Sequence, residues 1–165
     1  RENLGKPLES ICRAILETVE RFPDIRVIYP CHMNPNIRKL AHECLDGCSQ
    51  VLISEPMEVY DFHNLIRHAY LILSDSGGIQ EEAPSLGKPV LVLRDTTERP
   101  EGIAAGTLKL VGTDTDSIVR ETSILLDDPH AYAAMANAVN PYGDGRASER
   151  ITDALISYFE RNAAK

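Results

Sequence analysis

Short apolar runs alternate with segments of helical periodicity along most of the chain, and this alternation restricts the fold more than any other feature. Strands that are separated by helices pair in parallel, because a parallel connection needs a crossover long enough to hold a helix. The strand-like runs are Ile25–Tyr29, Val51–Ser54, Tyr70–Ser74, Pro89–Leu93 and Leu108–Val111. The pattern therefore predicts an α/β fold with five parallel strands.

The helices between these runs have recognisable start and stop residues. Proline is favoured at a first helical position, and glycine or proline commonly follows a helix end. The predicted helices are one following Pro7, one from Asn34 to about Leu45, Tyr60–His68, one from the Gly77-Gly78 turn to Ser85, Thr97–Ala105, and three at about 115–127, 129–138 and 147–163. Residues 1–139 are predicted to form the main domain, and residues 140–165 a linker and a C-terminal helix.

The composition argues against several classes of partner. A net charge of -8 is unlike the basic face that nucleic-acid binding needs. The histidines have no metal-site spacing, so no metal is expected. The sequence has no signal peptide and no apolar run long enough to span a membrane. The cysteines at positions 12, 31, 44 and 48 form neither a CxxC pair nor a dense framework, so we expect reduced thiols and a cytoplasmic location.

The strongest local signal is an apolar strand that runs through Ser74-Asp75-Ser76-Gly77-Gly78 directly into a helix. This geometry presents free backbone N–H groups and a positive helix dipole, and glycine lets an anion approach the backbone closely. A diphosphate would suit such a turn, with the Ser76 hydroxyl as a further donor. Alternatively, Asp75 or Ser76 caps the helix and the glycines fill a tight turn. The residues alone leave both interpretations open.

Familiar nucleotide fingerprints are absent from the sequence. There is no GxGxxG, and Pro89 follows Gly87-Lys88 where a P-loop needs Ser or Thr. Glu82 lies six residues beyond Ser76 and can face the same ligand, although Glu81 and Glu82 would also suit a solvated first turn. Arg99 follows a strand in a charged loop at the carboxyl edge of the sheet, where ligands bind in such folds.

Several segments together resemble the family of non-hydrolysing UDP-N-acetylglucosamine 2-epimerases. They are Arg1-Glu2-Asn3, 29–36, 75–89, 94–101 and the linker Asn140-Pro141-Tyr142-Gly143-Asp144-Gly145. The resemblance implies a Rossmann-like, doubly wound parallel sheet that forms the C-terminal, UDP-binding half of a GT-B fold. It also implies that the linker and last helix pack toward an N-terminal domain.

The resemblance assigns roles to individual residues. Ser76, Gly77 and Gly78 would hold the diphosphate, Glu82 the ribose hydroxyls, and Arg99 the substrate. Two further positions would lie at the uracil: Phe62 beside the ring, and Met57 through its backbone. His32 matches a histidine that bacterial members use for a second, regulatory UDP-N-acetylglucosamine.

The family interconverts UDP-N-acetylglucosamine and UDP-N-acetylmannosamine by eliminating and re-adding UDP, without a cofactor. Its carboxylates for C2 chemistry lie in the N-terminal domain, and its active-site histidine precedes Arg1. The resemblance thus implies no catalytic residue within the chain, an inactive isolated chain, and a whole protein that dimerises and serves cell-envelope polysaccharide biosynthesis. A GT-B glycosyltransferase, which the Asp95–Arg99 run disfavours, a non-catalytic nucleotide-sugar-binding module and a hydrolysing epimerase remain alternatives.

The resemblance also bears on the sheet. Its first, central strand would precede Arg1, so five strands are expected in the order three-two-one-four-five-six with the first absent. Ile25–Tyr29 and Tyr70–Ser74 would then either pair directly or leave a gap that another chain fills. Direct pairing is favoured, because unpaired backbone groups inside a sheet are unsatisfied.

Overall fold

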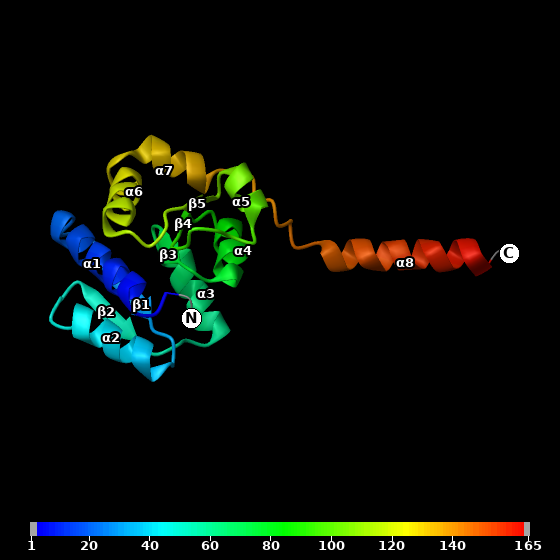
Figure 1. Ribbon diagram of the computed structural model, residues 1–165. Helices are drawn as coiled ribbons and strands as arrows, with labels where there is room; N and C mark the ends of the chain where they lie inside the picture. Colours follow the sequence, from blue (N-terminus) through cyan, green and yellow to red (C-terminus); the bar gives the residue numbers. More distant parts are fainter. Residues whose placement is uncertain (1–2, 164–165) are drawn as a thin grey trace.

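The computed structural model describes residues 3–163, so the Arg1-Glu2 part of the family resemblance lies outside the described residues. Strands and helices alternate as far as β5, and three helices follow (Figure 1). The strands are β1 (Val27–Pro30), β2 (Val51–Ser54), β3 (Ile72–Ser74), β4 (Val90–Val92) and β5 (Leu108–Leu110). The helices are α1 (Lys6–Arg21), α2 (Pro35–Leu45), α3 (Val59–His68), α4 (Gly77–Ser85), α5 (Pro100–Ala105), α6 (Thr115–Asp127), α7 (Pro129–Ala136) and α8 (Ala147–Ala163).

The strands form two separate parallel sheets within the described residues. One pairs β1 with β2, with Val27 opposite Val51, and the other has the order β3-β4-β5. The predicted α/β class and parallel pairing are confirmed. The predicted direct pairing of Ile25–Tyr29 with Tyr70–Ser74 is wrong, because β1 and β3 belong to different sheets.

Helix α1 gives a physical reason for this separation. It packs against both α2 and α6, so it lies between the helix beside β1–β2 and the helix beside β4. Its buried Cys12 and Ile15 share one apolar cluster with Cys31, which follows β1, and with Leu91 of β4. The buried apolar face of α1 therefore stabilises the observed arrangement, in which α1 covers residues of both sheets.

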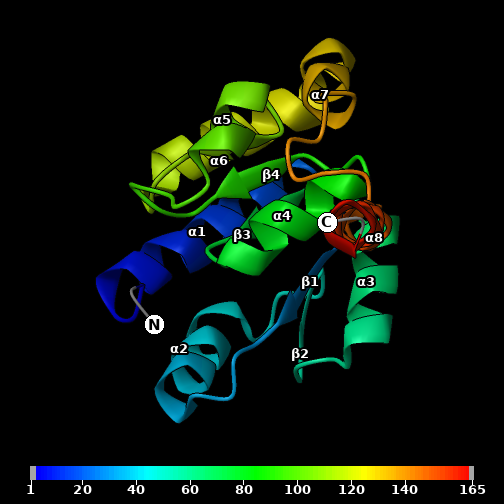
Figure 2. The same cartoon turned by 90° about the vertical axis from the view of Figure 1, so that its right-hand side faces the viewer.

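Helices cover the β3-β4-β5 sheet on both faces, as a doubly wound fold requires (Figure 2). Strand β4 shows this in its side chains, because Leu91 lies in the cluster with α1 and α6 while Val90 and Val92 lie in the cluster with α3 and α4. All three residues are fully buried. A continuous apolar run is the expected sequence of a parallel strand that is buried on both faces.

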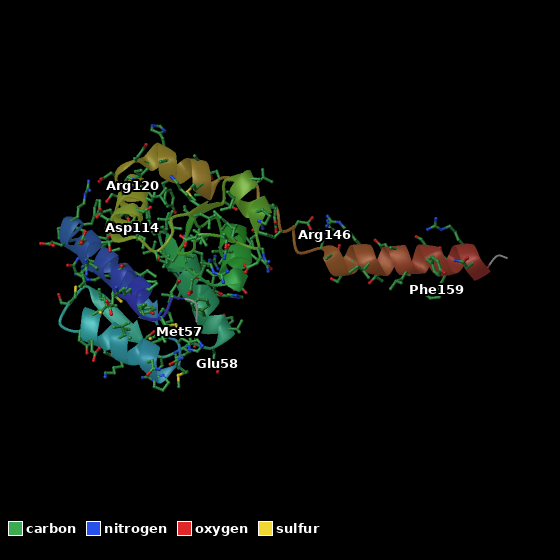
Figure 3. The ribbon with its side chains drawn as sticks, viewed as in Figure 1. Met57, Glu58, Asp114, Arg120, Arg146 and Phe159 are labelled. Atoms are coloured by element: carbon green, nitrogen blue, oxygen red, sulfur yellow. The ribbon has the colours of Figure 1, made fainter. Side chains whose placement is uncertain are left out.

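Helix α8 extends away from the rest of the chain (Figure 1). Its exposed apolar side chains include Ile151, Leu155 and Phe159, and Figure 3 shows Phe159 on the isolated part of the helix. The prediction that this helix packs toward another domain stays a prediction.

The predicted helix Thr97–Ala105 begins later than expected, at Pro100. The Thr97 hydroxyl accepts a hydrogen bond from the Arg99 N–H (3.1 Å), and this local turn replaces the first helical turn. Residues 97–99 therefore belong to the loop that follows β4.

Candidate functional site

The polar segments singled out from the sequence lie at the carboxyl ends of the strands. Ser74 ends β3, and the Ser76-Gly77-Gly78 turn follows it into α4. Arg99 lies in the loop between β4 and α5. Because β3 and β4 are parallel neighbours, both loops leave the same edge of one sheet. This is the edge at which open α/β sheets bind ligands.

Ser76 is the N-cap residue of α4, but its side chain makes no capping hydrogen bond. Its own N–H donates to the Ser74 hydroxyl (3.1 Å), which stabilises the turn before the helix. The N–H groups of the first helical turn have no intrahelical acceptor in any α-helix. The capping role that the sequence left open for Ser76 is therefore not observed, and the turn presents backbone donors at the positive end of α4.

Neither glycine of the turn is explained by the protein's own geometry. Gly77 and Gly78 are absent from the glycines with positive φ. A Cβ built on Gly77 would meet no atom within 4 Å, and one on Gly78 would meet only ordinary contacts, at 3.6 Å from Glu82 Oε1 and 4.0 Å from Ser76 Oγ. The tight-turn explanation therefore fails at both positions, because a side chain would fit in the protein as it stands.

The two neighbouring glutamates of α4 have different partners. Glu82 Oε2 lies 3.0 Å from His63 Nε2 on α3, and its Oε1 is close to Gly78. Glu81 accepts a hydrogen bond from Arg99 Nε. Successive helical residues point about 100° apart, which explains the divergence. Of the two carboxylates, Glu82 is the one beside the glycine turn.

Arg99 donates three hydrogen bonds. Its N–H donates to Thr97 Oγ1, its Nε to Glu81, and its Nη1 to the Glu98 carbonyl at 3.1 Å. The hydrogen bond to Glu81 raises the pKa of the Arg99 guanidinium above its ordinary value. Arg99 is thus a fixed cation on the loop next to the glycine turn.

Helix α3 and the loop before it carry the residues expected near the uracil base. Phe62 is half-buried and packs against the cluster of Ile66, Val90 and Val92. Met57 is half-buried in the loop between β2 and α3, where Figure 3 labels it with its neighbour Glu58. The contact of His63 with Glu82 brings this part of α3 against α4.

His32 lies in the loop between β1 and α2 and is exposed. Its Nδ1 accepts a hydrogen bond from the Asn34 N–H (3.0 Å), so the neutral ring carries its proton on Nε2. The Asn34 side chain accepts in turn from the Asn36 N–H (2.9 Å) and caps α2. His32 thus follows a strand of the β1–β2 sheet, whereas the glycine turn follows a strand of the other sheet.

Sequence reasoning missed several residues that build this site. It assigned no role in ligand binding to His63 and no partner to Glu81. It also overlooked Gln80, which is fully buried. The sequence did indicate this burial, because Gln80 lies on the same helix face as the apolar residues Ala83 and Pro84.

No group of three or more His, Cys, Asp and Glu residues suitable for a metal ion occurs within residues 3–163. Likewise, none of the helices in this described range has the length and apolar character needed to cross a membrane.

Comparison with known proteins identifies a matching family. The family model for UDP-N-acetylglucosamine 2-epimerase matches residues 1–156. A UDP-N-acetylglucosamine 2-epimerase of Bacillus subtilis is 55% identical over 159 residues, which are 96% of this chain and 42% of that relative. The chain thus spans less than half the length of this curated relative.

Solved structures give the same result. A putative UDP-N-acetylglucosamine 2-epimerase from Listeria monocytogenes superposes with a TM-score of 0.93 at 51% identity, over 98% of this chain and 43% of that one. The Neisseria meningitidis enzyme, solved bound to UDP-GlcNAc, has a TM-score of 0.90 at 50% identity, over 95% and 42%.

A more distant likeness concerns the fold alone. The C-terminal domain of a group 1 glycosyl transferase from Francisella tularensis has a TM-score of 0.67 at 15% identity, over 86% of this chain and 77% of that one. The epimerases are similar to this chain in sequence as well as in fold, and their family model matches nearly the whole length of the chain. The chain belongs to the UDP-N-acetylglucosamine 2-epimerase family.

Proposed function

We propose that this chain binds the UDP part of UDP-N-acetylglucosamine at the turn between β3 and α4. The observation that carries the proposal is the uncrowded Cβ position of both Gly77 and Gly78. Neither residue has a positive φ or a crowded Cβ position, so close approach of a ligand remains as the reason for glycine. A diphosphate fits, because the helix terminus supplies N–H donors and a positive dipole.

Each side chain around the turn has a role in this proposal. The N–H groups of Gly77 and Gly78 and the Ser76 hydroxyl bind the phosphate oxygens, and Arg99 adds positive charge from the adjacent loop. Glu82 accepts hydrogen bonds from the two ribose hydroxyls while His63 orients its carboxylate. Phe62 and the Met57 backbone hold the uracil.

The proposed reaction is the interconversion of UDP-N-acetylglucosamine and UDP-N-acetylmannosamine by elimination and re-addition of UDP. Negative charge builds up on the departing diphosphate in the transition state. Donors that are already oriented toward it stabilise that charge without reorganising. Proton transfer at C2 needs an acid or base, which we assign to an N-terminal domain outside this chain.

Other parts of the chain fit the same proposal. The apolar side of α8 would pack on the N-terminal domain of a whole protein that dimerises, and His32 would bind a second, regulatory UDP-N-acetylglucosamine. The four cysteines are free, which suits a reducing compartment such as the cytoplasm. The bound UDP-GlcNAc of the similar Neisseria meningitidis structure supports the choice of ligand.

Proton NMR of the full-length protein with UDP-N-acetylglucosamine tests the reaction. UDP-N-acetylmannosamine should accumulate without an added acceptor. Release of free N-acetylmannosamine would indicate a hydrolysing epimerase, and turnover only with a sugar acceptor would indicate a glycosyltransferase. The 165-residue chain alone should give no product, since it supplies the nucleotide site without the groups for C2 chemistry.

A further inference from the structure

A chain of hydrogen bonds joins the glycine turn to the loop that carries Arg99. It begins at the Ser76 carbonyl, which accepts from Gln80 Nε2 (3.2 Å). Gln80 Oε1 accepts in turn from the Thr97 hydroxyl, and Thr97 Oγ1 accepts from the Arg99 N–H (3.1 Å). Two side chains thus connect the backbone at Ser76 with the backbone at Arg99.

Gln80 occupies an unusual position for an amide. Its side chain is fully buried, beside Ala83 on the inner face of α4. Burying an amide is unfavourable unless its donor and acceptor groups are bonded, whereas methionine would fill a similar volume without that requirement. Here both ends of the amide are bonded, one to each loop. Packing alone therefore does not account for glutamine at this position.

Thr97 provides the connection that the Arg99 loop needs. Arg99 is the N-cap residue of α5, and its carbonyl accepts a hydrogen bond from the Gly102 N–H of that helix (3.2 Å), whereas its side chain makes no capping bond. Glu81 accepts a hydrogen bond from Arg99 Nε, and this bond orients the Arg99 side chain. The Thr97 hydroxyl settles the position of the backbone relative to α4.

We propose that Gln80 and Thr97 are positioning residues that fix Arg99 relative to the Ser76-Gly77-Gly78 turn. In that position the turn and the guanidinium bind the same diphosphate. Gln80 is buried and acts through its neighbours. The inference rests on the proposed function, because it needs a diphosphate between the two loops.

The experiment compares UDP with uridine, which lacks the phosphates, by isothermal titration of the full-length protein. Thr97→Val removes the hydroxyl with little change in volume, and Thr97→Ser is the matched control that keeps it. Thr97→Val should weaken UDP binding about tenfold, as expected when a charged contact is misplaced, and should leave uridine binding unchanged. Thr97→Ser should stay within about threefold of the wild-type affinity for UDP. Gln80→Met should reproduce the effect of Thr97→Val.

A second background separates positioning from general loosening of the fold. In an Arg99→Ala protein, Thr97→Val should cause no further loss of UDP affinity, because the group that it positions is already absent. An equal loss for UDP and uridine, or the same tenfold loss in the Arg99→Ala background, would overturn the inference. A third outcome is that the wild type binds UDP, the Arg99→Ala variant does not, and Thr97→Val keeps the wild-type affinity. That outcome would overturn the positioning role of Thr97 and leave the proposed function intact. Failure of the wild type to bind UDP would overturn both.

Discussion

Glu82 Oε2 lies 3.0 Å from His63 Nε2, and the same carboxylate borders the Gly77-Gly78 turn through Oε1. This contact joins α3, which carries Phe62 at the expected uracil position, to α4, which begins at the glycines expected at the phosphates. A carboxylate held in this way is oriented before ribose arrives, so little of its rotamer freedom remains to be lost on binding.

Glu82→Ala should weaken UDP binding of the full-length protein more than Glu81→Ala does. Loss of a charged acceptor for the ribose hydroxyls costs on the order of 1.5–3 kcal/mol. Glu81 instead bonds Arg99, so its removal acts only through the guanidinium. Isothermal titration measures both variants. A larger loss at Glu81, or equal losses, would show that the wrong carboxylate has been assigned to the ribose.

Gly102→Ala should destabilise the protein by about 1–3 kcal/mol, the usual range for overpacking a tight site. A Cβ at this position would come within 2.4 Å of both Leu108 Cδ1 and Tyr142 Oη. The free energy of unfolding in urea measures the effect. Adding Tyr142→Phe removes the close Tyr142 oxygen and leaves Leu108, so the double variant should recover part of the loss. A Gly102→Ala protein as stable as the wild type would contradict the close packing of the linker on α5.

The free energy of unfolding should decrease at alkaline pH because of the buried Cys12 thiol. Burial, with a smaller effect of Cys44, raises the pKa of the Cys12 thiol to about 12, whereas an unfolded cysteine ionises near pH 8.5. The folded state therefore holds this proton more tightly. Its contribution to stability is complete below about pH 8.5 and is lost as the pH rises toward 12.

Urea unfolding between pH 7.5 and 10 checks this expectation, with Cys12→Ala as the comparison. The variant should lose less stability over that range than the wild type. Some loss should remain in it, because burial also raises the pKa of the Cys31 thiol and of Tyr29. Identical slopes for the two proteins would mean that Cys12 ionises as easily in the folded state as in the unfolded one.

Local sequence patterns predicted much of the fold. Strand β2 has the predicted bounds, Val51–Ser54, because an apolar run between turn residues already defines it. The gap between β1 and β3 was not predictable in this way. It depends on α1 packing between α2 and α6, which is a tertiary relationship that no local pattern encodes.

The candidate site, like the fold, was predictable from the sequence only in part. The turn at Ser76, Gly77 and Gly78 was evident from the order of strand, small residues and helix. The partners of Glu81 and Glu82 were not, because they come from loops and helices 18 and 19 residues away along the chain. The missing capping bond of Ser76 and the space around the glycines also weakened the capping and tight-turn explanation, which the sequence could not distinguish from phosphate binding.

The central claim is that Gly77 leaves room for a diphosphate, and Gly77→Ala tests it most directly. The free protein has space for the new Cβ, and alanine favours a helix over glycine, so stability should be unchanged or should rise by up to about 1 kcal/mol. Isothermal titration of the full-length protein with UDP should show an affinity at least about tenfold below that of the wild type, because the methyl group occupies the ligand's space. Wild-type affinity for UDP in a stable Gly77→Ala protein would contradict the account.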